Sequence, residues 1–306
     1  MHKNLLRSCA LLSISTLYLI TPTVNAQLEA QDAASEVTFT FQTVNYPGDT
    51  FTQLLGINKN NEIAGYHGSG ATGHPNKGFV LTLPNKFTLE NFPGSVQTQV
   101  IGINDSGNTD GFYIDSKGVN HGFLDIGGTF QTRDFAPATA NQLLGLNNLL
   151  QAAGFYADSA NLNHALVFDS NGGLYQVITD GHAPGGMQET GVNNSGWSSG
   201  FYVDSKQVNH GFLLANGKLT TLDYPQSTST QAFGLNDSGE VVGTYTDQGG
   251  LIHGFIYKGG TFQQVDDPHG VGMTLINGVN NAGWIVGFYG SCASGGTTCN
   301  GFVGTP

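Results

Sequence analysis

The chain has 306 residues, enough for one large domain with a substantial core, and 45 of them are glycine. Charged residues make up 10% of the chain and aromatic residues another 10%, which argues against a helical bundle, a coiled coil and a disordered chain. The formal net charge of −12 makes nucleic acid and anionic membrane surfaces poor partners.

Residues 1–26 have the pattern of a secretory signal peptide. Lys3 and Arg7 precede an apolar stretch, and a small-residue ending predicts cleavage after Ala26. The apolar stretch is too short to span a bilayer, and no later stretch is long enough. Residues 27–37 are polar and rich in alanine, and we expect a loose leader there. The sequence therefore predicts a secreted protein, or one in the periplasm or at the cell surface, without an integral membrane segment.

A repeat dominates the rest of the chain. The pattern Gly-x-Asn, six further residues and Gly-x-Tyr occurs six times, with the starting glycines separated by 46, 43, 46, 43 and 44 residues; in the first copy the tyrosine comes one place early. A period near 44 residues, with short strands and glycine turns, is typical of one four-stranded propeller blade. We therefore expect an all-β, six-bladed β-propeller over residues 38–306.

The second copy shows how each blade is predicted. We expect strands at Thr98–Asn104, Asn108–Ile114, His121–Ile126 and Thr129–Phe135, separated by tight turns. The turn Asp105-Ser106-Gly107 and its counterparts also suggest calcium loops, but each offers too few carboxylate oxygens. We therefore expect turn geometry, with neither a metal ion nor a cofactor.

The two ends of the chain predict a closed ring. The sixth copy stops at Pro306, after its third strand. Its missing fourth strand has a counterpart at the other end, because residues 40–47 resemble residues 129–135 of the second copy. We expect this N-terminal strand to complete the last blade and to leave no open edge.

The repeat resembles the HAF-type repeats of exported bacterial proteins. Four copies carry His-Gly-Phe or His-Ala-Leu after Gly-x-Asn-x-x-Gly, at His121, His164, His210 and His253. Leu150 replaces the last glycine of that pattern in the third copy, while copies one and six have Lys77 and Asn300 in place of the histidine. The resemblance covers residues about 40–306, and it implies export and repetition but no established activity.

Each of these histidines follows an aspartate by six residues, so both lie at the ends of one hairpin. The pairs are Asp115/His121, Asp158/His164, Asp204/His210 and Asp247/His253. Copies one and six lose both members together, as expected of interacting partners. One interpretation is a ring of acid–base or metal-binding groups. We favour a structural hydrogen bond that fixes the imidazole tautomer, because a group repeated around a ring is more typical of a scaffold than of an active site.

Copies one and six, which become neighbours once the ring closes, have longer loops between the tyrosine and the Gly-Phe step. One loop carries His67 and His74, and the other carries Cys292 and Cys299, which we expect to form a disulfide. In a propeller these loops share a face with the connections between blades. That loop face would also carry Asp223, Asp266, His182 and His269, and these residues with His67 and His74 are our candidate binding residues. The alternative is that blades at a seam are simply atypical, as terminal repeats often are.

The sequence favours binding over catalysis. It contains no Gly-x-Ser-x-Gly and no His-Glu-x-x-His motif. A secreted enzyme should also show a single, non-repeated cluster of acid and base, whereas the copies here are equivalent. We expect a monomeric binding module for an uncharged glycan or a protein. A polysaccharide-active hydrolase or lyase at the channel mouth is the first alternative, and a structural envelope component is the second.

Overall fold

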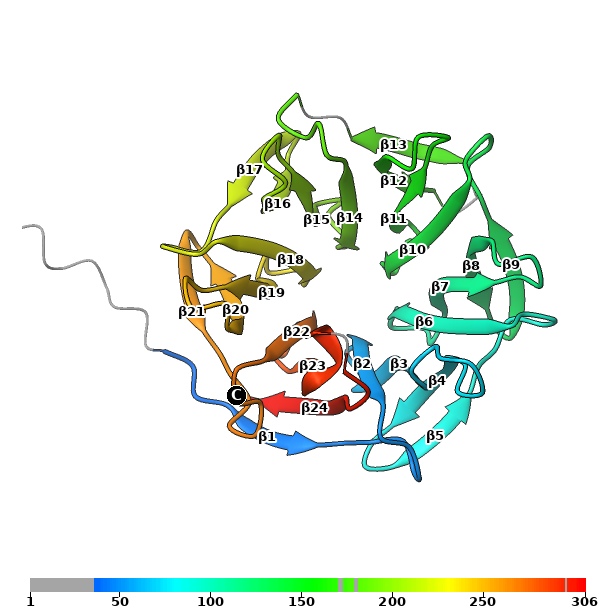
Figure 1. Cartoon of the computed structure of the whole chain (residues 1–306), viewed down its shortest axis with the longest axis horizontal. Helices are drawn as coiled ribbons and strands as arrows, with labels where there is room; N and C mark the ends of the chain where they lie inside the picture. Colours follow the sequence, from blue (N-terminus) through cyan, green and yellow to red (C-terminus); the bar gives the residue numbers. More distant parts are fainter. Residues whose placement is uncertain (1–35, 170–172, 179–180, 295) are drawn as a thin grey trace, which may run out of the picture. The chain divides into compact units, whose positions relative to one another are not determined.

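The structure is a computed structural model and describes residues 36–169, 173–178, 181–294 and 296–306. Residues Thr38–Pro306 form one compact unit, in which six four-stranded sheets surround a central channel (Figure 1). The predicted signal peptide and most of the predicted leader lie outside the described residues. The prediction of an all-β, six-bladed propeller is confirmed.

Blades 1 to 5 are antiparallel meanders whose first strand lines the channel and whose fourth strand lies at the rim (Figure 1). Blade 1 contains β2 (Thr52–Ile57), β3 (Glu62–His67), β4 (Lys77–Thr82) and β5 (Lys86–Leu89); blade 2 contains β6 (Gln97–Ile103), β7 (Thr109–Ile114), β8 (Asn120–Ile126) and β9 (Thr129–Arg133). Blade 3 contains β10 (Ala140–Leu146), β11 (Ala152–Ala157), β12 (Asn163–Phe168) and β13 (Leu174–Ile178). Blade 4 contains β14 (Met187–Val192), β15 (Ser198–Val203), β16 (Asn209–Ala215) and β17 (Lys218–Leu222); blade 5 contains β18 (Ser229–Leu235), β19 (Val241–Thr246), β20 (Ile252–Lys258) and β21 (Thr261–Gln264).

Blade 6 joins the two ends of the chain. It contains β22 (Thr274–Val279), β23 (Ile285–Tyr289) and β24 (Asn300–Thr305), and its fourth strand is β1 (Thr40–Thr43). β1 runs antiparallel to β24, the blue and red strands of Figure 1. The Phe41 ring packs on Phe302 with 5.5 Å between centroids, and the Val44 amide donates to the Gly301 carbonyl at 2.8 Å. The predicted closure by the N-terminal strand is confirmed.

The described part of the chain has one short 3-10 helix, η1 (Ser291–Ser294), and no helix there is long and apolar enough to cross a membrane.

The first glycine of each repeat lies where neighbouring inner strands approach closely. In blade 2 the pairing of β6 with β7 shifts register between Val100 and Gly102, and the other five blades show the same bulge. A β-carbon on Gly102 would lie 2.8 Å from the amide nitrogen of Leu146 in the next blade. Glycine is therefore required here, because the channel wall leaves no room for a side chain.

The core lies between adjacent blades. The phenylalanines of the Gly-Phe step have no exposed surface, namely Phe79, Phe123, Phe212, Phe255 and Phe302. Beside them, the third-strand glycine leaves space for the next blade, since a β-carbon on Gly122 would lie 3.0 Å from Leu143 Cγ. The motif therefore encodes the packing of one blade on the next.

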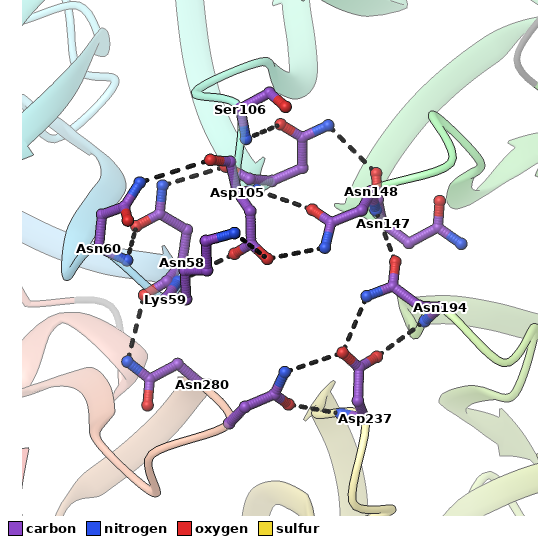
Figure 2. A network of polar contacts seen from close by, with 12 residues as sticks. Asn58, Lys59, Asn60, Asp105, Ser106, Asn147, Asn148, Asn194, Asp237 and Asn280 are labelled. Atoms are coloured by element: carbon purple, nitrogen blue, oxygen red, sulfur yellow. Dashed lines mark hydrogen bonds and ion pairs between the residues drawn. The ribbon is translucent and has the colours of Figure 1, made fainter.

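The asparagine of Gly-x-Asn closes a turn and ties its blade to the next one. Asn104 Oδ1 accepts from the amides of Ser106 at 3.0 Å and Asn108 at 3.1 Å, while Asn104 Nδ2 donates to the Asn147 carbonyl at 3.2 Å. The same donation continues around all six blades and closes from Asn280 to Asn58 at 3.1 Å. We call these six buried residues the asparagine ring: Asn58, Asn104, Asn147, Asn193, Asn236 and Asn280. Figure 2 shows several of these contacts.

Candidate functional site

The channel has its largest hollow at the end opposite the asparagine ring. A cavity of about 290 Å³ lies there, and the spaces nearer the asparagine ring measure about 80 and 70 Å³. The beginnings of five inner strands contribute one glutamine each to its wall: Gln53, Gln99, Gln142, Gln188 and Gln231, here called the glutamine ring. In the sixth blade the equivalent residue is Leu275. These glutamines are not among the predicted binding residues, although a glutamine three places before the first glycine in five copies is a visible signal.

The amides of the glutamine ring have open hydrogen-bonding capacity. Gln53 is partly engaged, because Tyr66 donates to its Oε1 at 2.6 Å and its Nε2 lies 3.4 Å from Cys299 Sγ. Burial raises the pKa of Tyr66, so its hydroxyl stays a donor. Within the described ranges, the other four glutamine side chains make no hydrogen bond to protein. Each such amide offers an acceptor and two donors.

The rest of the cavity wall is largely apolar. Leucine, isoleucine and phenylalanine side chains come from the inner strands, at Leu55, Ile101, Leu144 and Phe233, and aromatic rings come from the second strands, at Tyr66, Phe112 and Phe201. None of the described residues that line the cavity is charged. The arrangement fits an uncharged ligand that has both hydroxyl or amide groups and an apolar face.

On the loop face, each histidine of blades 2, 4 and 5 lies between two carboxylates. His210 Nδ1 is 2.9 Å from Asp223 Oδ1 and its Nε2 is 3.6 Å from Asp204 Oδ2. His121 and His253 repeat this geometry with Asp134 at 2.6 Å and Asp266 at 2.8 Å, and with Asp115 and Asp247 at 3.6 Å. In blade 3, His164 Nε2 lies 3.0 Å from Asp158 Oδ2.

The nearer carboxylate in blades 2, 4 and 5 therefore belongs to the end of the fourth strand, not to the hairpin aspartate that the spacing indicated. Asp223 and Asp266, two of the candidate binding residues, contact His210 and His253 at hydrogen-bond distance. Asp266 also accepts from the Gly254 amide at 3.1 Å, so it fixes the start of β20. These contacts give both aspartates a structural explanation.

The hairpin aspartates close their own turns. Asp115 Oδ1 accepts from the amides of Lys117 at 2.8 Å and Val119 at 2.9 Å. The Val119 hydrogen bond, with help from Lys117 and His121, holds the pKa of Asp115 below its ordinary value. The carboxylate is thus a turn-closing group first and a partner of His121 second.

The other candidate binding residues do not all gather in one place. His269 Nδ1 lies 3.1 Å from Asp267 Oδ1, and His182 is exposed in the connection between β13 and β14. His67 and His74 are brought together, because both contact Asp49 Oδ2, at 2.8 and 2.9 Å. Asp49 lies in the connection between β1 and β2 and is not among the residues that the repeat pattern indicates.

The predicted disulfide between Cys292 and Cys299 is present, with an S–S distance of 2.06 Å. Cys299 is fully buried and packs with Phe51 and Tyr66 of blade 1. Its amide donates to the Thr50 carbonyl at 2.9 Å, so copies one and six are neighbours as predicted. A disulfide is typical of proteins that fold in an oxidising compartment.

Two carboxylates within the blades have no exposed surface and do not line the cavity. Asp110 Oδ1 accepts from the Gly102 amide at 2.7 Å, and burial raises its pKa to about 7. Glu189 has no exposed surface, and burial raises its pKa to about 8. The other inner strands have an apolar residue at the Glu189 position: Leu54, Val100, Leu143, Ala232 and Ile276.

Neither a protein-family model nor a curated protein matches this sequence. Among solved structures, the chain is similar to the SapL1 lectin in complex with α-methyl fucoside, at 12% identity and a TM-score of 0.52, over 78% of this chain and 88% of that one. It is also similar to an Aleuria aurantia lectin variant in complex with Fucα1-6GlcNAc, at 10% identity and a TM-score of 0.51, over 84% and 96%. A third similar structure is AofleA from Arthrobotrys oligospora, at 10% identity and a TM-score of 0.52, over 84% of this chain and 88% of that one. At these identities the likeness is one of fold alone.

Proposed function

We propose that this chain is a secreted glycan-binding module, and that the glutamine ring holds an uncharged sugar in the 290 Å³ cavity. The observation that carries the proposal is a set of four glutamine side chains with open hydrogen-bonding capacity around an uncharged, partly aromatic hollow. The lectins of similar fold have fucose-containing ligands in their names, which supports a glycan over a protein as the ligand. The signal-peptide pattern of residues 1–26 and the disulfide support secretion.

The chemistry of the cavity matches a sugar. Each sugar hydroxyl is both a donor and an acceptor, as is each glutamine amide, so the two can pair in either direction. The apolar C–H face of the ring would pack on Phe112, Phe201 or Phe233. The volume lies at the lower end of the range for small-molecule sites, which favours one terminal sugar residue over a long chain segment.

The test is a glycan array probed with the full secreted chain, followed by titration of the sugars that bind. We expect Gln99→Ala and Gln188→Ala to weaken binding about 3- to 10-fold each, the loss of roughly one net hydrogen bond. Gln42→Ala, at an exposed position on the rim strand β1, is the matched control and should leave the affinity unchanged. Equal affinities for all four proteins would contradict this location of the site.

A further inference from the structure

The loop between β3 and β4 places a serine and a histidine beside the carboxylate of Asp49. Ser69 Oγ lies 3.1 Å from His74 Nδ1, and His74 Nε2 lies 2.9 Å from Asp49 Oδ2. This is the order hydroxyl, imidazole, carboxylate, with each contact at hydrogen-bond distance. It is the arrangement in which an imidazole activates a hydroxyl nucleophile.

The hydrogen bonds fix the useful tautomer of His74. The Ser69 backbone amide donates to Nδ1 at 3.2 Å, so Nδ1 is an acceptor and the ring hydrogen is on Nε2. Nε2 then donates that hydrogen to Asp49. The single lone pair on Nδ1 is shared between the Ser69 amide and the Ser69 hydroxyl, so the hydroxyl lies within reach of a base that can take its proton. Either imidazole nitrogen can act as the base when the other one is held by a carboxylate.

Asp49 is fixed from three sides. Its side chain is 8% exposed; Oδ1 accepts from the Phe51 amide at 2.8 Å, and Oδ2 accepts from His67 as well as from His74. His67 is itself held by stacking on Tyr46, with 3.7 Å between ring centroids. Burial opposes the charged form of Asp49, but the hydrogen bonds from His67, Phe51 and His74 outweigh it, and the pKa of Asp49 lies below its ordinary value. The carboxylate therefore stays ionised and oriented.

The loop also places a side-chain amide near Ser69 and is open to solvent. Asn76 is 7% exposed and, within the described ranges, its Nδ2 donates no hydrogen bond; a β-carbon on Gly70 would lie 3.5 Å from this nitrogen. Asn76 Oδ1 lies at the same distance from that β-carbon, so the Asn76 amide as a whole lies beside Gly70, the residue that follows Ser69. The His74 side chain is 43% exposed, so a substrate can reach it from solvent.

The cluster is not repeated in the ring. The positions of the hairpin aspartate and histidine are Gly68 and Lys77 in this blade. A single cluster of acid and base is the feature we expected of a secreted enzyme and did not find in the sequence. We infer that Ser69, His74 and Asp49 form a nucleophile–base–carboxylate triad that hydrolyses carboxylic esters, and that the acyl group is small because the loop at residues 68–76 has no large apolar side chain to hold a longer one.

The reaction would proceed in two steps. Ser69 Oγ bonds to the carbonyl carbon of the ester while its proton passes to His74 Nδ1; the bond from that carbon to the alkoxy oxygen then breaks, and the alcohol leaves with the proton from His74. A water molecule next gives a proton to His74 and bonds to the same carbon. The bond to Ser69 Oγ breaks, His74 returns the proton to Ser69, and a carboxylic acid is released. Asp49 stabilises the imidazolium in both steps.

The first test is labelling of the full chain with a fluorophosphonate, followed by peptide mass spectrometry. We expect the phosphonyl adduct on the peptide that contains Ser69, and no adduct after Ser69→Ala or His74→Gln. An unlabelled Ser69 peptide under conditions that label a known serine hydrolase would overturn the inference. Neither the probe nor the readout involves a sugar, so failure here is distinct from failure of the glycan proposal.

The second test is hydrolysis of p-nitrophenyl acetate. We expect Ser69→Ala to lower kcat/KM about 100-fold or more. Asp49 is a positioning residue, so Asp49→Asn should lower kcat and leave KM unchanged. The matched control is His121→Gln, which removes a partly exposed imidazole paired with a carboxylate but without a neighbouring serine. Equal rates for the parent chain and Ser69→Ala, with unchanged circular dichroism, would show hydrolysis by surface imidazole and overturn the triad.

Discussion

Blades 2, 4 and 5 each contain the same cluster of two aspartates and a histidine, whereas the blades on either side of the seam, blades 6 and 1, lack it. In each of these clusters a histidine contacts two carboxylates, a hairpin aspartate on one side and a fourth-strand aspartate on the other. In blade 6 the last two positions are occupied by Asn300 and Asn45, which bond to each other at 2.8 Å. In blade 1 they are Lys77 and Asn91. Because all three residues of the cluster change together, we interpret the cluster as a structural feature of the blade. The residues that replace it in blades 6 and 1 are free to take other roles.

The opposite face of the ring shows the same contrast. In five of the six blades, the residue that follows the asparagine of the ring accepts a hydrogen bond on its side chain from a backbone amide of the preceding blade: Lys59 N to Asp105, Asp105 N to Asn148, Asn148 N to Asn194, Asn194 N to Asp237 and Asp237 N to Asn281 (Figure 2). We call these hydrogen bonds links. The sixth link, from the backbone amide of Asn281 to residue 59, is missing because the Lys59 side chain has no acceptor atom. The seam is thus the one place on this face where the described chain of links is interrupted.

The largest effect should come from removing the strand that closes the seam. Deleting residues 38–46 would expose the edge of β24 and remove the buried Val44. We expect loss of the cooperative thermal transition, or aggregation, with a chain that begins at Thr38 as the control. A truncated chain that melts like the control would show that the seam closes without β1.

The buried Glu189 should destabilise blade 4 in a pH-dependent way. Below about pH 4.5 it is protonated in both states; as the pH rises to about 8 the unfolded chain ionises and the folded chain does not, so stability is lost across this interval. Glu189→Leu restores the residue type of the other blades. We expect it to raise stability by more than about 2 kcal/mol at pH 8 and by much less at pH 4.5 in denaturant titrations. A gain of equal size at both pH values would contradict the ionisation argument.

A smaller effect is expected for the two carboxylates that contact His210, which should differ in how strongly each is coupled to the histidine. Double-mutant cycles are expected to give a coupling of about 0.5–1 kcal/mol for His210 with Asp223, and less for His210 with Asp204, because the first contact is shorter. The same cycle at Asn45 and Asn300 provides the seam comparison. Its coupling should not respond to salt, whereas that of His210 with Asp223 should fall as salt is added. A stronger coupling to Asp204 would reverse our assignment of the main partner.

The smallest effect should come from restoring the missing link. Lys59→Asn places a side-chain oxygen opposite the backbone N–H of Asn281, which donates to no other group in the described part of the chain. We expect a gain of about 0.5–1 kcal/mol in the free energy of unfolding. Lys59→Ala, which removes the exposed ion pair with Asp105 but adds no acceptor, is the control and should give no gain. Equal stabilities for the two variants would show that the gap in the chain of links is immaterial.

The sequence predicted the fold because its determinants are local and repeated. Glycine turns and the Gly-Phe step recur with one period, and the N-terminal strand copies its counterparts closely enough to be assigned to the last blade. The partner of His210 was missed because Asp223 is brought near only by the pairing of β16 with β17. A signal existed, since Asp134, Asp223 and Asp266 are replaced by asparagine in the two copies that lack the histidine.

The candidate site was harder to predict, for a physical reason. The glutamine ring becomes one site only when six inner strands converge, and a periodic list of glutamines does not show that they share a cavity. The Ser69 cluster depends on Asp49, which lies in a connection that precedes blade 1 and has no counterpart in the repeat. Residues far apart in the sequence meet only after the ring closes. Composition and repeat spacing predict that the ring closes, but not which side chains then lie together.

The asparagine ring determines how this protein can be produced. Asn104, Asn193 and Asn236 each begin an Asn-x-Ser sequence, the acceptor for N-linked glycosylation. In the folded chain the Nδ2 atom that would receive the oligosaccharide is buried and already donates to the next blade. In a eukaryotic secretory pathway the oligosaccharide is attached while the chain is still unfolded, and an oligosaccharide on these buried nitrogens has no room between the blades. A host without this modification is therefore a requirement for closing the ring, and yeast or mammalian secretion would yield chains blocked at up to three turns.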